Sequence, residues 1–278
     1  MEQWRILPYR KDHAFANMAI DEAIFRENQR LESPPTLRFY GWQPPAVSLG
    51  YFQDFDKEVN EEFCREKRID IVRRPTGGKA VLHQNDLTYS LVARGDHPLF
   101  PRGILGTYLV ISRCIINSLL RIGIDAQMET GHRYLECDDL KAFCFSVPSQ
   151  YEILVKGRKI CGSAQVRSNG SFLQHGSILL DFDPETIWAS ISMGNLARTA
   201  YLDHLRDSVI SVNDLLESRI TADDFSSIVK ESFEDVLNIK LCEGELTARE
   251  ECLKERLLEE KYRTDLWNRS AGTKNVSN

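Results

Sequence analysis

Apolar residues recur at helical spacing in several parts of the chain. In residues 14–28 the apolar positions 15, 18, 19, 23 and 24 share one face of a helix, with acidic and basic residues on the other. The same spacing predicts helices over residues 104–121 and 221–237. A fourth helix, to about residue 262, begins at a capping box formed by Thr247 and Glu250.

Short segments rich in β-branched and aromatic residues predict strands between these helices. They cover residues 36–42, 46–50, 69–73, 87–93, 151–155, 159–166 and 172–182. Lys156-Gly157 and Asn169-Gly170 predict turns between the last three strands. Asn-Gly is the stronger signal, because both central residues of a type I′ turn need a positive φ. Helices at both ends, without regular strand–helix alternation, predict an α+β fold in which mixed or antiparallel sheets are flanked by helices.

Composition narrows the class of protein. The chain has 278 residues, 42% of them hydrophobic, and its formal charge of −6 argues against a nucleic-acid binder with a broad basic face. The chain contains no run of 18 apolar residues, so we expect no membrane span. The N-terminus lacks the apolar core of a secretory signal, so we expect no signal peptide. The 7 cysteines are odd in number and form no C-x-x-C pair, so we expect free thiols in the cytoplasm and no metal site.

A basic, glycine-containing loop over residues 73–78 is the first candidate for chemistry. Gly77 and Gly78 allow the backbone to approach a ligand closely, and Arg73 and Arg74 are suited to gripping a carboxylate or phosphate. An ordinary turn flanked by surface arginines explains the same residues about equally well. The loop matches neither G-x-x-x-x-G-K-[ST] nor G-x-G-x-x-G, so it carries no nucleotide-binding fingerprint.

Cys144 and Lys159 form the second candidate. Each has a commoner interpretation, since a cysteine between two phenylalanines is usually a packed thiol and a lysine after a hairpin turn is usually solvated. A free thiol is only a few per cent ionised at pH 7. An ammonium about 4 Å away contributes up to about 4 kcal/mol at an effective dielectric of 20, enough to lower the thiol pKa by about 3 units. Paired with Lys159, Cys144 would therefore be an effective nucleophile.

Small and polar residues near these motifs extend the candidate site. Gly162, Ser163 and Ala164 interrupt a predicted strand, and glycine inside a strand often marks close approach by a ligand. His83 and His175 lie beside the two motifs, as pocket residues or as hydrogen-bonded core histidines. We expect Cys161 to point away from Lys159 and to be structural.

Three blocks of sequence resemble the signature motifs of the biotin/lipoate protein ligase family. They span residues 73–83, 157–165 and 175–180, and the resemblance runs from the helix at residue 17 to residue 268. It implies a catalytic domain over residues 1–245, a C-terminal helical extension over 246–269 and a disordered tail over 270–278.

Within that family the chain is most similar to the octanoyltransferase branch, whose members have a cysteine at the position of Cys144. The resemblance implies that Cys144 carries octanoyl as a thioester and that Lys159 lowers the thiol pKa. It places Arg73, Thr76, Gly77, Gly78, His83, Gly162, Ser163, Ala164 and His175 around the substrate. The implied donor is octanoyl-acyl carrier protein and the implied acceptor is a lipoyl domain such as the glycine cleavage H protein. The implied enzyme is a cytoplasmic monomer that needs no cofactor.

Two positions depart from the ATP-dependent ligases of the family. Lys79 replaces their usual third glycine, and Gln84 replaces the aspartate that usually follows the histidine. Three alternatives remain open: a lipoate–protein ligase, an amidotransferase that takes octanoyl from H protein, and a non-catalytic protein that binds acyl carriers.

Overall fold

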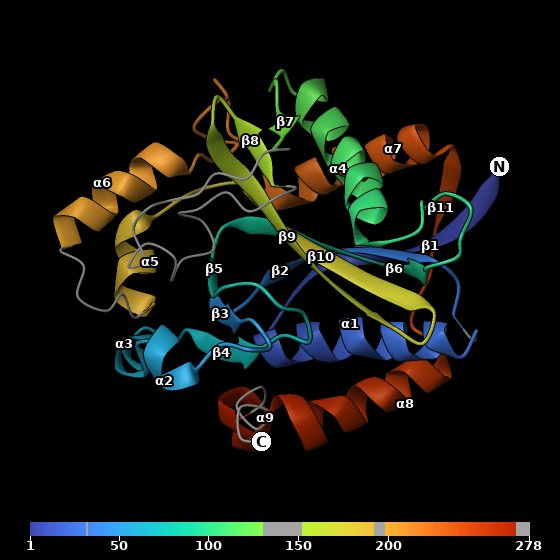
Figure 1. Ribbon diagram of the computed structural model, residues 1–278, viewed down its shortest axis with the longest axis horizontal. Helices are drawn as coiled ribbons and strands as arrows, with labels where there is room; N and C mark the ends of the chain where they lie inside the picture. The colour runs from blue at the N-terminus through green and yellow to red at the C-terminus, as the bar shows by residue number, and fades with distance from the viewer. Residues whose placement is uncertain (32, 130–151, 192–197, 271–278) are drawn as a thin grey trace.

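The computed structural model describes residues 1–31, 33–129, 152–191 and 198–270, and its centre is a mixed sheet (Figure 1). The strands follow the order β11-β1-β2-β6-β10-β9-β8-β7. β1 runs parallel to both of its neighbours, and the other pairs are antiparallel. The bounds are β1 (Glu2–Asp12), β2 (Thr36–Trp42), β6 (Asp86–Arg94), β7 (Gln127–Met128), β8 (Ile153–Val155), β9 (Arg158–Ser168), β10 (Ser171–Leu179) and β11 (Ile239–Glu243).

A second, three-stranded sheet lies at one end of the first. Its order is β4-β3-β5, with β3 (Ala46–Leu49) parallel to β4 (Asp70–Arg73) and antiparallel to β5 (Val81–His83). Short helices surround it: α2 (Phe55–Glu58), α3 (Glu61–Glu66), α5 (Pro184–Ser190) and α6 (Arg198–Ser208). The loop between β4 and β5 carries the glycine pair, so the small sheet holds both ends of that loop.

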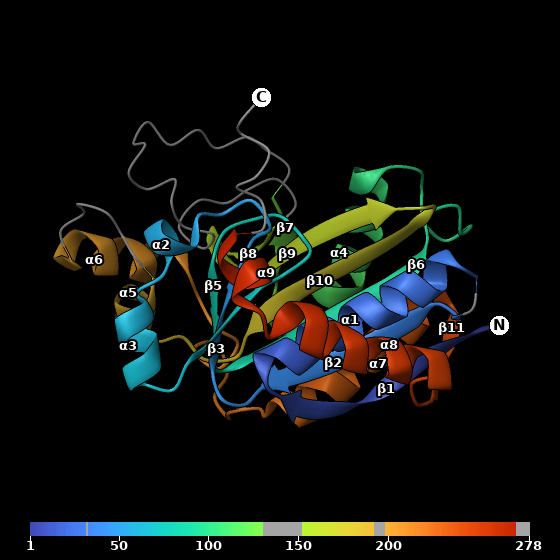
Figure 2. The same cartoon turned by 90° about the horizontal axis from the view of Figure 1, so that it is seen from below.

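Helices cover both faces of the large sheet (Figure 2). On one face lie α1 (Ala14–Gln29) and α8 (Ala248–Leu257), followed by a π-helical turn η2 (Leu258–Tyr262) and α9 (Asp265–Ser270). On the other face α4 (Ile104–Arg121) packs against α7 (Ala222–Leu237). The main hydrophobic core fills the space between that pair and the sheet. The α+β architecture expected from the sequence is thus confirmed.

The two predicted hairpin turns are present. Lys156 and Gly157 have φ of 50° and 78°, and Asn169 and Gly170 have φ of 47° and 77°. Both turns therefore place their central residues in the left-handed region that a type I′ turn requires. The β9–β10 turn puts Gly162 opposite Ser177 and Ser163 opposite Gly176, which aligns two of the three signature blocks.

Helix α4 is long and apolar enough, by length and hydropathy alone, to cross a membrane. Its apolar stripe includes Ile111, Ile115 and Leu119, all buried in the main core. A core helix of a globular protein meets the same criteria, and α4 packs like one.

The C-terminal segment lies against α1. Arg5 of β1 forms a buried ion pair with Glu250 of α8, with a 2.6 Å distance between Nη2 and Oε1. Glu22 of α1 accepts hydrogen bonds from Lys261 at 2.6 Å and from Tyr262. The final residues of the predicted tail, 271–278, lie outside the described part of the chain.

Candidate active site

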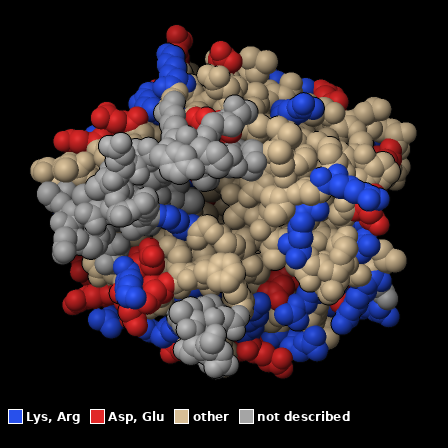
Figure 3. Space-filling model, in the orientation of Figure 1, with Lys and Arg blue, Asp and Glu red and all other residues tan. Residues whose placement is uncertain are grey.

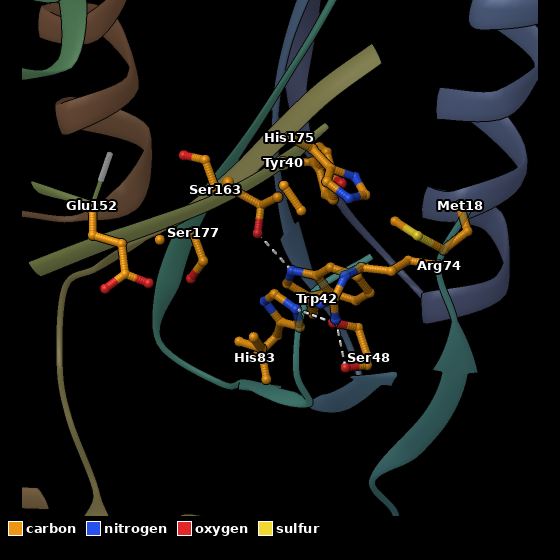
Figure 4. A pocket seen from close by; sticks show the side chains of 16 residues that line it. Met18, Tyr40, Trp42, Ser48, Arg74, His83, Glu152, Ser163, His175 and Ser177 are labelled. Atoms are coloured by element: carbon orange, nitrogen blue, oxygen red, sulfur yellow. Dashed lines mark hydrogen bonds between the residues drawn. The ribbon is translucent and has the colours of Figure 1, made fainter. Parts of the chain in front are cut away.

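A cavity of about 610 Å³, its open mouth included, lies where the two sheets meet α1 (Figure 4). Both sheets contribute side chains to its wall, as does the loop before β5. Its lining residues are Met18, Tyr40, Trp42, Ser48, Arg74, Gly78, Val81, His83, Thr88, Glu152, Gly162, Ser163, Ala164, His175, Gly176 and Ser177. Among the predicted site residues, Gly78, His83, Gly162, Ser163, Ala164 and His175 therefore meet around one cavity.

Lys159 lies directly behind this wall. The side chain is fully buried, and its Nζ forms an ion pair and a hydrogen bond with Glu152, which is 4% exposed. A Cβ at residue 162 would lie 2.8 Å from Cε and 2.9 Å from Nζ of Lys159. Glycine at 162 therefore leaves room for the ammonium beside the cavity, which explains why a strand interior carries this residue.

His83 is held in one orientation by polar groups on both ring nitrogens. Its Nδ1 lies 2.8 Å from Oδ2 of Asp86, and its Nε2 lies 2.9 Å from Oγ of Ser48. Trp42 stacks on the ring with centroids 4.1 Å apart. Burial disfavours the charged form of Asp86, but His83 and hydroxyl donors from Ser177 and Thr88 outweigh it and lower the pKa of Asp86. Asp86 is therefore a carboxylate at neutral pH.

His175 joins the glycine loop to α1. Its Nε2 lies 2.6 Å from Oγ1 of Thr76, and its Nδ1 lies 3.5 Å from Oδ2 of Asp21. Burial lowers the pKa of His175 even though Asp21 works in the opposite direction. His175 lines the cavity, whereas Thr76 is buried behind it and holds the ring in place.

Arg73 and Arg74 have different roles, and the prediction that Arg73 contacts substrate is wrong. Arg73 is 0% exposed, and its guanidinium donates to backbone carbonyls of residues 50, 51, 53, 267 and 268. All of these hydrogen bonds are made to the protein's own backbone. Arg73 of β4 therefore holds α9 and the loop after β3 in place. Arg74, the first residue after β4, lines the cavity instead.

Arg74 shapes the glycine loop from inside. Its guanidinium donates to the carbonyls of Ser48 at 2.8 Å, Gly77 at 2.9 Å and Lys79 at 2.7 Å. Gly78 has a φ of 91°, in the region that favours glycine. Gly77 is not among the cavity-lining residues, so its part in the site is to supply a carbonyl to Arg74.

Cys161 is a core residue. It is 1% exposed, and burial raises the pKa of its thiol to about 12. The expectation that it points away from Lys159 does not follow from a regular strand, in which residues two apart share a face. The pairing of β9 with β8 shifts register here, with Cys161 opposite Ile153 but Lys159 opposite Leu154, so Ile160 and Cys161 both enter the main core. Cys144 lies outside the described residues.

The sequence alone did not single out Ser48, Asp86 or Glu152. Asp86 follows His83 by only three residues, so the sequence could have suggested that the two side chains interact. Ser48 and Glu152 lie in or beside apolar strands, and only the tertiary structure brings them to the cavity. No group of three or more His, Cys, Asp or Glu side chains suited to a metal ion occurs in the described ranges.

Charges on the face shown in Figure 3 are mixed. Basic and acidic side chains alternate around an uncharged centre, and that centre is hollowed. The described residues on this face therefore form no continuous basic surface of the kind that binds nucleic acid.

Comparisons with known proteins identify the class to which this fold and cavity belong. Residues 13–234 match the family model for the lipoyl protein ligase A/B catalytic domain. A solved lipoate-protein ligase A bound with ATP is 28% identical, with a TM-score of 0.79 over 98% of this chain and 99% of that one. A putative lipoate protein ligase from T. acidophilum with bound lipoic acid is 27% identical, with a TM-score of 0.79 over 96% of this chain and 98% of the other.

Curated relatives narrow the class further. The octanoyltransferase LipM of Kyrpidia tusciae is 41% identical over 96% of this chain and 99% of its own length, and that of Bacillus subtilis is 39% identical over 96% and 98%. The chain belongs to the lipoyl protein ligase A/B family and, within it, to the LipM octanoyltransferases.

Proposed function

We propose that this protein moves an octanoyl group from acyl carrier protein to a lysine of a lipoyl domain through a thioester on Cys144. The thiolate attacks the carbonyl carbon of the donor thioester, and the carrier leaves as a thiolate that then takes a proton from water. The lysine amine then attacks the enzyme thioester, forming an amide and releasing Cys144. Each step exchanges an existing acyl bond, and thioester to amide is downhill, so the reaction consumes no ATP.

The buried ammonium of Lys159 beside the cavity is the observation that carries this proposal. An ammonium excluded from water acts on a nearby thiol far more strongly than a solvated one does. Gly162 leaves room for it, and Glu152 holds it in a fixed position. A solvent-exposed lysine would have neither a glycine beside its ammonium nor a buried carboxylate partner.

The wall of the cavity is suited to an acyl chain. Met18, Tyr40 and Val81 supply apolar surface. On one side the lining residues Gly162 and Ala164 are small and leave space for a ligand. Polar groups gather along the same wall, where His83, Ser163 and His175 would surround the reacting thioester. A narrow apolar pocket with a few convergent polar groups is the usual form of a small-ligand site.

The partners follow from the same reaction. A thioester donor and a lysine acceptor imply two carrier domains that visit the cavity in turn, and we expect these to be octanoyl-acyl carrier protein and the glycine cleavage H protein. The free cysteines at positions 64, 114 and 161 are consistent with the reducing cytoplasm in which both carriers work. We expect a monomer.

Intact-mass analysis after incubation with octanoyl-acyl carrier protein, without ATP, tests the proposal. The expected result is a gain of one octanoyl group that hydroxylamine removes and that Cys144→Ala abolishes. Cys161→Ala is the matched control: its thiol is buried with a raised pKa, so the adduct should persist. Absence of any adduct in the unmodified protein would refute the covalent route.

The same variants separate the alternatives. A lipoate–protein ligase would keep its activity in Cys144→Ala and would require ATP. An amidotransferase would form the adduct from octanoylated H protein and not from acyl carrier protein. A non-catalytic carrier-binding protein would form no adduct from either donor.

A further inference from the structure

Ser48, His83 and Asp86 form a hydrogen-bonded relay that opens onto the cavity. Ser48 lies on β3 of the small sheet, His83 on β5 and Asp86 at the start of β6 in the large sheet. Oγ of Ser48 is 2.9 Å from Nε2 of His83, and Nδ1 of His83 is 2.8 Å from Oδ2 of Asp86. The reaction proposed above assigns no proton transfer to this relay, although Ser48 and His83 both line the cavity (Figure 4).

The neighbours of the relay fix the position of each proton. Arg74 Nη1 donates to Oγ of Ser48 at 3.1 Å, and because a guanidinium only donates, the single Ser48 proton is directed to His83. Asp86 as a carboxylate only accepts, so Nδ1 of His83 carries the ring proton. Nε2 of His83 is therefore the proton acceptor of the relay, and Ser48 is the group through which it meets the cavity.

Asp86 faces His83 with a carboxylate whose hydrogen bonding is incomplete. Oδ2 of Asp86 accepts from His83, Ser177 and Thr88, whereas the buried Oδ1 has no hydrogen-bond partner among the described residues. A buried carboxylate that lacks part of its hydrogen bonding gains from a facing imidazolium. Trp42 stacked on the ring excludes water from one face of His83.

The proposed reaction has a step that needs such an acceptor. A lysine side chain has a pKa of about 10.4, so at pH 7 only about one molecule in 2,500 carries the neutral amine that attacks a thioester. A group that removes this proton within the cavity typically accelerates such a step by about 10² to 10⁴-fold.

We propose that Ser48 is a catalytic residue of the second half-reaction: its hydroxyl takes a proton from the incoming lysine ammonium while passing its own proton to Nε2 of His83. This inference rests on the proposed function. Ser48 stays a hydroxyl, the ammonium becomes an amine, and His83 becomes an imidazolium facing Asp86. The amine attacks the thioester carbon, the C–S bond breaks, and the departing sulfur takes the second proton from nitrogen to become the Cys144 thiol. His83 later returns its proton to water through Ser48.

Other charged groups near His83 set the conditions for this transfer. Asp86 of β6 contacts Nδ1 of His83, and the Arg74 guanidinium of the glycine loop contacts Ser48 on the other side of the relay. His175 of β10, which faces Asp21 of α1, also interacts electrostatically with His83. Of these groups only Asp86 is hydrogen-bonded directly to the His83 ring.

Amines of different basicity test the relay. The acyl-enzyme is isolated first, and its decay is then measured at pH 7 with n-butylamine, which is protonated like lysine, and with methoxyamine, which is largely neutral. In Ser48→Ala we expect the rate with n-butylamine to fall about 10²-fold and the rate with methoxyamine to change less than about 3-fold. Raising the pH towards 10 should restore the n-butylamine rate.

Two further variants keep the test decisive. His83→Gln should show the same dependence on amine basicity, and the double variant should be no slower than His83→Gln alone, because the two residues act in one relay. Ser177→Ala removes another hydroxyl from Asp86 at 2.6 Å but leaves the relay intact, so any loss should be equal for both amines.

Equal loss for both amines in Ser48→Ala, or no loss for either, would overturn the proposal. Failure of the unmodified protein to form an acyl-enzyme would be seen before any amine is added and would overturn the proposed function instead, and the relay with it.

Discussion

Replacing Lys159 by methionine should destabilise the protein in a way that depends on pH. The variant leaves the Glu152 carboxylate 4% exposed without the ammonium that faces it. Breaking one side of a buried ion pair costs about 3–5 kcal/mol. Glu152 can escape this cost by taking up a proton, which for an ordinary glutamate costs about 4 kcal/mol at pH 7 but only about 1 kcal/mol at pH 5.

The sign of the pH effect follows from the proton count. The folded variant binds a proton that its unfolded chain does not bind near neutral pH, so its stability falls as the pH rises. The free energy of unfolding of Lys159→Met, measured by denaturant titration, should therefore lie about 4 kcal/mol below that of the unmodified protein at pH 7. At pH 5 the gap should narrow to about 1 kcal/mol.

A double variant separates folding from chemistry. Lys159→Met with Glu152→Leu replaces the ion pair by apolar side chains of similar size, so most of the lost stability should return. Acylation should not return: in the proposed reaction the ammonium lowers the pKa of the Cys144 thiol by about 3 units, and its removal leaves the thiol about 3% ionised at pH 7, a loss of about 30-fold. Equal destabilisation of Lys159→Met at both pH values, or an active double variant, would refute this reasoning.

Three other substitutions have distinct expected outcomes. Gly162→Ala places a Cβ within 3 Å of the buried Lys159 ammonium and should slow acylation several-fold, because the ammonium must shift away from its position beside the cavity; the unfolding free energy, checked by urea titration, should fall by about 1–3 kcal/mol. Arg73→Leu should lower thermal stability by more than 5 °C, because buried carbonyls of α9 lose their donors; a scanning calorimeter measures this. Asp86→Asn should remove stability that is present above about pH 4 and lost as the pH falls through the lowered pKa of Asp86, so denaturant midpoints of the two proteins should converge in acid.

Local patterns predicted most of the regular elements. The helix over residues 14–28 appears as α1, and both hairpin turns are present. Asn169 and Gly170 tolerate the positive φ of their turn, whereas Lys156 adopts a φ of 50° in the other. The strands β1 and β11 were not predicted. β1 contains Pro8 and charged residues at both ends, and it becomes a strand because β2 and β11 pair with it from distant parts of the chain.

The candidate site was predictable only in part. The glycines at positions 77, 78 and 162 correctly indicated that the loop and β9 belong to the site, because glycine can be recognised directly in a sequence. The division of labour between Arg73 and Arg74 was not visible, since both are arginines and only the partners at residues 267 and 268 distinguish them. Glu152 was missed for a similar reason, because its function depends on Lys159 lying across the β8–β9 turn.

The contact between Arg73 and Asn268 has a consequence for how the enzyme is made. The two residues are 195 positions apart, and the backbone N–H of Arg73 donates to the Asn268 side chain at 2.9 Å while the indole of Trp267 donates to the carbonyl of Arg73. A growing chain therefore cannot secure the base of the glycine loop until residue 268 has emerged from the ribosome. The wall of the cavity that Arg74 and Gly78 line is therefore completed only after residue 268 has been made, although Arg73 itself is synthesised 195 residues earlier.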